Sequence, residues 1–170
     1  GNSGTTDALA GFTTNQGTGR FELRGGRNFA LGTFSNAGSM NVGAGSTLTA
    51  ATYTQTAGVT DVNGLLLVAG AIALDGGTFT GSGAVTGNII NNGNVSPGNS
   101  PGTLSINGDY LQSSGVLNIE LGSLAHDQLV VSGTATLGGT LMVSLWAEPG
   151  AQLFMPSPGQ QFDILKALVI

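Results

Sequence analysis

The residues of this chain that could perform chemistry are few, and the first is a serine. Gly98-Asn99-Ser100-Pro101-Gly102 fits G-x-S-x-G, the pattern of the nucleophile elbow in α/β-hydrolases. That elbow uses the backbone N–H after the serine in its oxyanion hole, and Pro101 has no N–H. No helical pattern follows the serine. We therefore expect a rigid turn between Pro97 and Pro101, and no nucleophile.

The second candidate is His126, the only histidine of the chain, on which a catalytic triad or a zinc site would depend. Its neighbour Asp127 could orient it only if the two side chains converged. Adjacent residues of a strand point in opposite directions and do not converge. The sequence predicts a polar loop residue at this position.

Aspartates are the remaining candidates, because pairs of carboxylates perform acid–base chemistry on glycans. The four that could line one groove are Asp61, Asp75, Asp109 and Asp127. No lysine or arginine occurs between Arg27 and Lys166 to neutralise an acidic sugar. We predict that the chain is not an enzyme and has no catalytic residue. A β-helical carbohydrate-active enzyme, a lyase or a hydrolase, is the alternative function.

Cofactor-binding patterns are incomplete. The chain has no cysteine, which excludes disulfides and thiolate metal ligands. Asp75-Gly76-Gly77 is a fragment of the calcium-binding G-G-x-G-x-D repeat, and no EF-hand loop occurs. Neither Gly81-Ser82-Gly83 nor Gly43-Ala44-Gly45 completes a nucleotide-binding G-x-G-x-x-G. We predict no cofactor, no cofactor-binding residue and no metal ligand.

The composition predicts an all-β protein. Hydrophobic residues make up 40% of the chain and charged residues 8%, and there are 30 glycines. Glycines and β-branched residues disfavour helices, while apolar residues that alternate along the whole chain favour packed strands over disorder. The longest uncharged apolar run, residues 65–74, is too short to span a bilayer, so we predict no direct insertion into a membrane.

The charge pattern limits the partners. A net charge of -5 argues against nucleic acid and anionic lipid as partners. Arg20, Arg24 and Arg27 lie close together. We expect them on a solvated strand face, with an anion-binding patch as the alternative.

An internal repeat is the most informative feature of the sequence. Short motifs of similar composition end on Gly38, Gly58, Gly77, Gly93, Gly115 and Gly139, which are 20, 19, 16, 22 and 24 residues apart. About twenty residues with two or three short strands is the size of one coil of a parallel β-helix. The sequence predicts a right-handed parallel β-helix of about eight coils over residues 1–170. Glycines and asparagines would form its corners.

Alternating apolar residues predict which side chains point inward. The predicted inward sets are Phe21 and Leu23; Leu117, Ile119 and Leu121; and Leu141, Val143 and Leu145. Asn36, Asn92 and Asn118 could in addition stack into amide ladders. A β-propeller and a β-sandwich stay open, because Asn63-Gly64, Asn92-Gly93 and Asn107-Gly108 resemble hairpin turns.

One stretch carries a family resemblance. The sequence Ser96-Pro97-Gly98-Asn99-Ser100-Pro101-Gly102-Thr103-Leu104-Ser105-Ile106-Asn107-Gly108-Asp109-Tyr110, continued by residues 127–141 and more loosely by 159–165, resembles the passenger regions of bacterial autotransporters. The similarity covers residues 88–165 well and residues 1–87 only as a generic repeat. In that family such a segment is the C-terminal part of the passenger β-helix, with its autotransporter-associated repeat.

The resemblance implies a role and a location. It implies a structural stalk or adhesive segment that is secreted or anchored in the outer membrane of a Gram-negative bacterium. The partners it implies are the protein's own C-terminal membrane barrel, which is not in this chain, and a host-cell or glycan surface. It implies no catalytic residue, and the stem of a toxin or protease passenger is a further alternative. Both ends of the chain look cut, so we expect a fragment of a larger surface protein.

Overall fold

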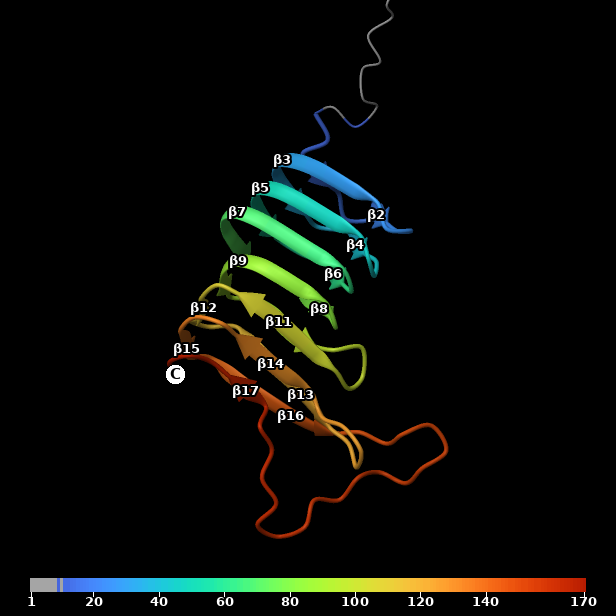
Figure 1. The fold of residues 1–170 in the computed structure, drawn as a ribbon, viewed down its shortest axis with the longest axis vertical. Helices are drawn as coiled ribbons and strands as arrows, with labels where there is room; N and C mark the ends of the chain where they lie inside the picture. The colour runs from blue at the N-terminus through green and yellow to red at the C-terminus, as the bar shows by residue number, and fades with distance from the viewer. Residues whose placement is uncertain (1–8, 10) are drawn as a thin grey trace, which may run out of the picture.

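The computed structural model describes residue 9 and residues 11–170, and these residues wind into an all-β parallel solenoid of about five turns without a helix (Figure 1). The larger sheet has ten strands: β1 (Thr14–Asn15), β3 (Asn28–Asn36), β5 (Thr47–Gln55), β7 (Leu65–Leu74), β9 (Ala84–Asn91), β11 (Thr103–Asn107), β12 (Tyr110–Gln112), β14 (Gln128–Val131), β15 (Ala135–Leu137) and β17 (Leu165–Lys166). The smaller sheet has seven: β2 (Arg20–Leu23), β4 (Ser39–Val42), β6 (Val59–Val62), β8 (Thr78–Gly81), β10 (Asn94–Pro97), β13 (Val116–Leu121) and β16 (Thr140–Leu145).

The register of the smaller sheet confirms that the spacing between the repeat glycines is the length of one coil of the solenoid. Its strands stack in the order β2, β4, β6, β8, β10, β13 and β16, each parallel to the next. The residues paired along this stack are Ser39, Val59, Thr78, Asn94, Val116 and Thr140. Each of them directly follows one of the six repeat glycines. The propeller and sandwich hypotheses are wrong, because both need antiparallel neighbours.

The repeat glycines form a corner in which consecutive coils touch through their backbones. The amide N–H of Val59 donates to the carbonyl of Gly38 at 2.9 Å, and that of Thr78 donates to Gly58 at 2.9 Å. A Cβ on Gly58 would overlap the carbonyl oxygen of Gly38, and Gly58 has a φ of +69°. Glycine is required here both for the close approach and for the left-handed backbone.

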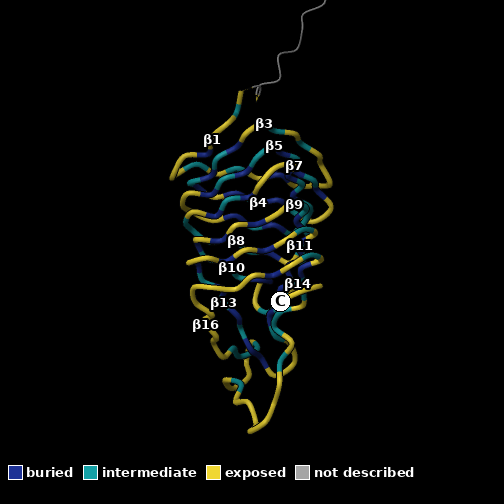
Figure 2. The backbone as a smooth tube through the Cα atoms, turned by 90° about the vertical axis from the view of Figure 1, so that its left-hand side faces the viewer, coloured by how far each residue is buried: buried dark blue, intermediate teal, exposed yellow. Residues whose placement is uncertain are grey.

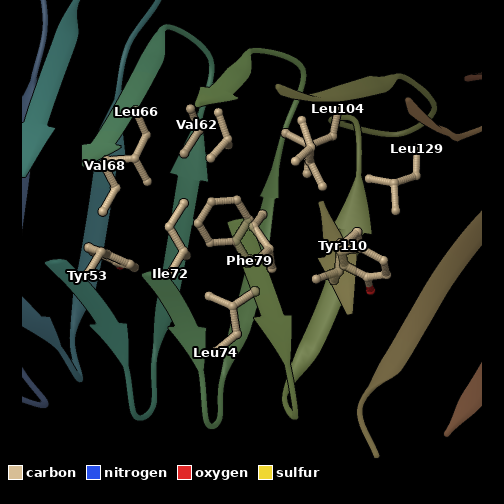
Figure 3. Packing of buried hydrophobic residues seen from close by; sticks show 14 of the residues in the cluster. Tyr53, Val62, Leu66, Val68, Ile72, Leu74, Phe79, Leu104, Tyr110 and Leu129 are labelled. Carbon is tan, nitrogen blue, oxygen red and sulfur yellow. The ribbon is translucent and has the colours of Figure 1, made fainter. Parts of the chain in front are cut away.

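The hydrophobic core is a column of side chains between the two sheets. In β13, Leu117, Ile119 and Leu121 are buried and alternate with half-buried residues, as predicted. Figure 3 shows Ile72, Phe79 and Tyr110 pointing into this interior from successive coils. Such alternation follows from the pleat of a strand that has one inward face.

The third predicted inward set is not buried. Leu141, Val143 and Leu145 pair with Leu117, Ile119 and Leu121 and so continue the inner columns. They are nevertheless 53%, 47% and 37% exposed. Among the described residues β16 has a strand neighbour only on the β13 side, so no coil covers them. The prediction of their direction agrees with the register, and the prediction of burial is wrong. Figure 2 shows the exposed backbone that extends from β16 beyond the buried middle coils.

A charge at the centre of the column should unfold the chain. Ile119 is fully buried, so Ile119→Asp is expected to lower the free energy of unfolding by several kcal/mol, because it buries an unpaired carboxylate. Chemical denaturation followed by circular dichroism measures this. Asn118→Asp places the same charge on the outward face of the same strand, and it should leave the midpoint nearly unchanged. Equal midpoints for the two variants would contradict the assignment of the inner face.

The glycine corner gives a second test. Gly58→Ala should destabilise the chain by at least about 1 kcal/mol, because the new Cβ meets a backbone carbonyl and the backbone is left-handed. Gly32 lies exposed in β3 with nothing within 4 Å of an added Cβ. Gly32→Ala is therefore the matched control, and it should be neutral or slightly stabilising. A larger loss in the control than in Gly58→Ala would refute the account of the corner.

Candidate functional site

The structure places Ser100 in an exposed bend between β10 and β11. Its φ is 65°, and it is the only non-glycine residue with a positive φ in the described part of the chain. The strand β11 begins at Thr103, so no helix follows the serine. The neighbouring Gly98 forms an isolated bridge to Gly81 in the preceding coil. The turn predicted from the two prolines is confirmed.

Asp127 holds three segments together. It is 2% exposed, and its carboxylate accepts hydrogen bonds from the amides of Gly102 at 2.8 Å and Glu120 at 2.9 Å. Burial raises the pKa of the Asp127 carboxyl, and the two N–H donors oppose that rise. The carboxylate therefore fastens the Ser-Pro-Gly turn and the end of β13 to the start of β14.

His126 and the other aspartates do not converge on Asp127. The His126 ring packs edge-on against Phe162, with ring centroids 5.6 Å apart. Asp61 lies in β6 and accepts from the side-chain amides of Asn41 and Asn63, while exposed Asp109 accepts from the amide of Thr134 at 2.8 Å.

The four candidate aspartates thus occupy different positions of the coil. Asp75 lies exposed at the corner after β7 and Asp109 between β11 and β12, whereas Asp61 lies within the smaller sheet. No group of three or more acidic or histidine side chains that could hold a metal ion occurs in the part of the chain that the structure describes. No helix among these residues is long and apolar enough to cross a membrane.

The three arginines are solvated, as predicted, but only Arg20 lies in a strand, while Arg24 and Arg27 lie in the segment between β2 and β3. Arg20 and Arg24 flank Glu22 in β2 and both pair with its carboxylate, Arg24 at 3.0 Å. Both side chains are more than half exposed. Arg27 lies exposed in the segment that leads to β3.

A ladder of buried amides runs through the interior, and sequence reasoning identified only part of it. The last residues of successive larger-sheet strands lie in register: Asn15, Asn36, Gln55, Leu74, Asn91, Gln112 and Leu137. All five amides in this column are buried. Asn36 belongs to the ladder as predicted. Asn92 is exposed and Asn118 lies on the outer face of β13, so those two predictions are wrong.

The ladder forms two hydrogen-bonded groups, one on each side of Leu74. In the first, Asn15 donates to Asn36 at 2.8 Å, and Asn36 donates to the hydroxyl of Thr60, which also bonds to the Tyr53 hydroxyl at 2.5 Å. A buried polar group that has a partner avoids most of its desolvation cost. Each donor in this group reaches an acceptor in its own or the next coil.

The second group lies around Tyr110. Its hydroxyl accepts from Asn91 at 2.9 Å and donates to Gln112 at 2.7 Å. The side-chain amide of Gln112 donates to three backbone carbonyls, at Gly115, Gly138 and Thr140. Burial raises the pKa of the Tyr53 and Tyr110 hydroxyls above their usual value, so both stay protonated.

A cavity of about 270 Å³ lies at the C-terminal end of the core. Its lining is mostly aliphatic and comes from β12, β13, β15, β16 and the chain that leads into β17: Gln112, Leu117, Leu137, Gly138, Gly139, Leu141, Ile164 and Leu165. The amide of Gln112 is occupied by its hydrogen bonds, so the cavity offers apolar surface and little polar chemistry.

Comparison with known protein families, curated proteins and solved structures gives no match to this chain. Function therefore has to be inferred from the geometry of the coils and from the motif of residues 96–141. That geometry combines parallel coils, an internal amide ladder and polar outer faces.

The amide ladder can be tested with two neighbouring asparagines. Asn91→Ala removes a buried donor to Tyr110 and Gln112 and the acceptor of the Gly93 amide, and it should cost about 1–3 kcal/mol of unfolding free energy. Asn92→Ala removes an exposed amide that accepts only from Ser114, and its effect should stay within about 0.5 kcal/mol. Thermal and denaturant melts measure both. Equal losses would show that the ladder does not stabilise the fold.

Proposed function

We propose that this chain is a structural stalk or adhesive segment of a secreted or outer-membrane-anchored surface protein of a Gram-negative bacterium. The proposal is supported by the motif of residues 96–141, which resembles the C-terminal part of autotransporter passengers. In the structure this motif spans consecutive coils, from β10 to β16.

The observation that carries the proposal is the continuous stack of parallel strands with its internal amide ladder. Paired strands join each coil to its neighbours, as in other solenoids, and one exposed hydrogen bond, from Asn99 to Asn63, reaches past a coil. The hydrogen bonds that join coils run along the rod. Such a rod holds attached regions at a fixed distance. Its half-buried outer rows of threonine, serine and asparagine offer a polar, weakly charged surface for contacts.

The handedness of the solenoid and the number of its coils belong to the same proposal. We assign residues 1–170 to one segment of a right-handed β-helix, because crossover connections between parallel strands are right-handed in nearly all proteins. About eight coils result when the incomplete coils at both ends are counted with the complete ones. The path of eight strands through the larger sheet, from β1 to β17, supports that count.

The partners follow from the proposed role. They are the protein's own C-terminal membrane barrel, which lies outside this chain, and a host-cell or glycan surface. The same coils would also serve as the non-catalytic stem of a toxin or protease passenger.

Surface display tests the proposal. The chain is placed between a signal peptide and an autotransporter barrel in a Gram-negative host, with an epitope at its N-terminal end. We expect antibody to bind the epitope on intact cells, and we expect Ile119→Asp to reduce this binding several-fold, because the unfolded coils no longer support display. Epitope exposure that is the same for the two chains, or absent from both, would contradict the stalk role.

Turnover of glycans tests the enzyme alternative. A polysaccharide panel incubated with the purified chain should remain intact. Cleavage that disappears in Asp109→Asn would replace the stalk by a carbohydrate-active enzyme. The separate positions of Asp61, Asp75, Asp109 and Asp127 in the coil are the reason to expect no cleavage.

A further inference from the structure

Asparagine followed by glycine occurs three times in the chain, at Asn63, Asn92 and Asn107. This pair is chemically reactive, because the glycine has no Cβ to hinder its backbone nitrogen from attacking the side-chain amide carbon of the asparagine. Ammonia then leaves, and the asparagine becomes aspartate or isoaspartate. The attacking nitrogen has to be released from its hydrogen bonds first, so the surroundings of each glycine decide which pair can react.

The pair at Asn63 is held at both of its reacting groups. The Gly64 amide donates to the backbone carbonyl of Val42 at 2.9 Å. The side-chain amide of Asn63 donates to Asp61 at 2.8 Å, and its side-chain oxygen accepts from the amide of Ser82. Neither the glycine nitrogen nor the asparagine side chain can turn toward the other without breaking these bonds.

The pair at Asn92 is held by the amide ladder. The Gly93 amide donates at 3.0 Å to the side-chain oxygen of Asn91, which is fully buried. The Asn92 side chain is exposed, and its oxygen accepts from the Ser114 hydroxyl at 3.2 Å. The side chain is therefore able to reorient, but the nitrogen that would attack it is engaged by a buried acceptor.

The pair at Asn107 has a different environment. Asn107 is the exposed last residue of β11, and Gly108 lies in the corner between β11 and β12 (Figure 1). The Gly108 amide donates to the hydroxyl of Ser132 in the next coil at 3.1 Å, and the same hydroxyl donates to the side-chain oxygen of Asn107 at 3.1 Å. Ser132 is exposed as well. A single hydroxyl thus contacts both of the groups that have to react.

This hydroxyl can move a proton between the two groups, because a serine hydroxyl donates and accepts at the same time. As the Gly108 nitrogen bonds to Cγ of Asn107, its proton passes to Oγ of Ser132, and the Ser132 hydroxyl proton passes to Oδ1 of Asn107. The Oδ1 proton then moves to the side-chain nitrogen, the Cγ–Nδ2 bond breaks and ammonia leaves. Water opens the resulting cyclic imide at either carbonyl, which yields aspartate or isoaspartate.

From these contacts we propose that Asn107 is a site of spontaneous deamidation, and that Ser132 transfers the proton. The peptide that has to rotate lies at an exposed corner, where local opening takes less free energy than in the buried parts of a coil. The inference concerns this corner of the solenoid and does not depend on the proposed stalk role.

Deamidation would change the contact between two coils. The Gly108 carbonyl accepts from the Gly133 amide at 3.0 Å, and the Asp109 carboxylate accepts from the Thr134 amide at 2.8 Å. Isoaspartate carries the main chain through its side-chain carbon and so lengthens the backbone before Gly108, which displaces both contacts. Either product also adds a negative charge near Asp109. The modification therefore loosens the corner between β11 and β12.

The unaltered chain gives the first test. The folded protein is incubated in mildly alkaline buffer and digested with chymotrypsin, which cleaves after aromatic residues and leucine. The three asparagines then lie in separate peptides, 54–65, 80–104 and 105–110. Fragmentation mass spectrometry measures the conversion of each asparagine. We expect Asn107 to react several-fold faster than Asn63 and Asn92, and we expect the three rates to converge in denaturant, where no pair is protected.

Two results of this experiment would overturn the proposal. One is a rate at Asn107 in the folded chain that is no faster than the rates at Asn63 and Asn92. The other is a ranking that persists unchanged in denaturant, because the surroundings described above would then not be its cause.

Variants of Ser132 test the proton transfer. Ser132→Ala should slow the reaction of Asn107 several-fold, whereas Ser132→Thr keeps a hydroxyl and should restore the rate. An Asn107 that reacts as fast or faster in folded Ser132→Ala would refute the role of this serine. If Ser132→Ala fails to fold, the ranking of the three asparagines in the unaltered chain still decides the site.

Ser114→Ala is the matched control. Ser114 bonds to the side chain of Asn92, but the Gly93 amide bonds to Asn91 instead, so this hydroxyl does not connect the two reacting groups. The variant should leave all three rates unchanged. Asn63 and Asn92 also report on folding in every variant, since both react faster in an unfolded chain. A slower Asn92 in Ser114→Ala would show that contact with the side chain alone is enough, and it would refute the proton transfer.

Discussion

Backbone contact between consecutive coils at the glycine corner is the constraint on which the rest of this structure depends. At this corner two coils lie so close that a Cβ on Gly58 would overlap the carbonyl of Gly38. The amide of Val59 donates a hydrogen bond to that same carbonyl. This bond recurs at each turn of the smaller sheet and sets which residues pair. Because the side chains of a strand alternate, a shift of one residue at this corner would turn the whole inner face outward.

The amide ladder reinforces that register from inside the core. Leucine columns tolerate sliding, since apolar contacts have no direction, whereas a buried amide loses stability unless its partners stay in place. Asn36, Asn91 and Gln112 bond to hydroxyls and carbonyls in adjoining coils. Leu74 interrupts the ladder, and next to it the side-chain amide of Gln55 donates to the Gly76 carbonyl while its buried Oε1 has no hydrogen-bond partner. The interior therefore combines non-directional burial with directional bonds at one corner.

The same geometry explains why the ends differ from the middle. A coil in the middle of the stack has its inner side chains covered by two neighbours, and Ile119 is fully buried. At β16 the column of inner residues continues with one neighbour only, and the apolar cavity opens there. A solenoid has no closure of its own, unlike a barrel, so a strand with one neighbour among the described residues, such as β16, has its inner side chains covered on one side only.

The sequence by itself determined the coil length, the corner glycines and the alternation of inward and outward residues. These are consequences of local sterics and of the strand's two-residue period, which are visible in any single repeat. The turn at Pro97 to Pro101 and the loop position of His126 were also predictable, because they depend on neighbouring residues. Only the tertiary structure decided that Asn91 and not Asn92 is buried, that Asp127 clamps Gly102 and Glu120, and that Leu141 and Val143 are exposed. Apart from the Asp127–Glu120 bond, which joins residues seven positions apart, each of these depends on what lies one coil away, about twenty residues along the chain, and local pattern carries no information on that contact.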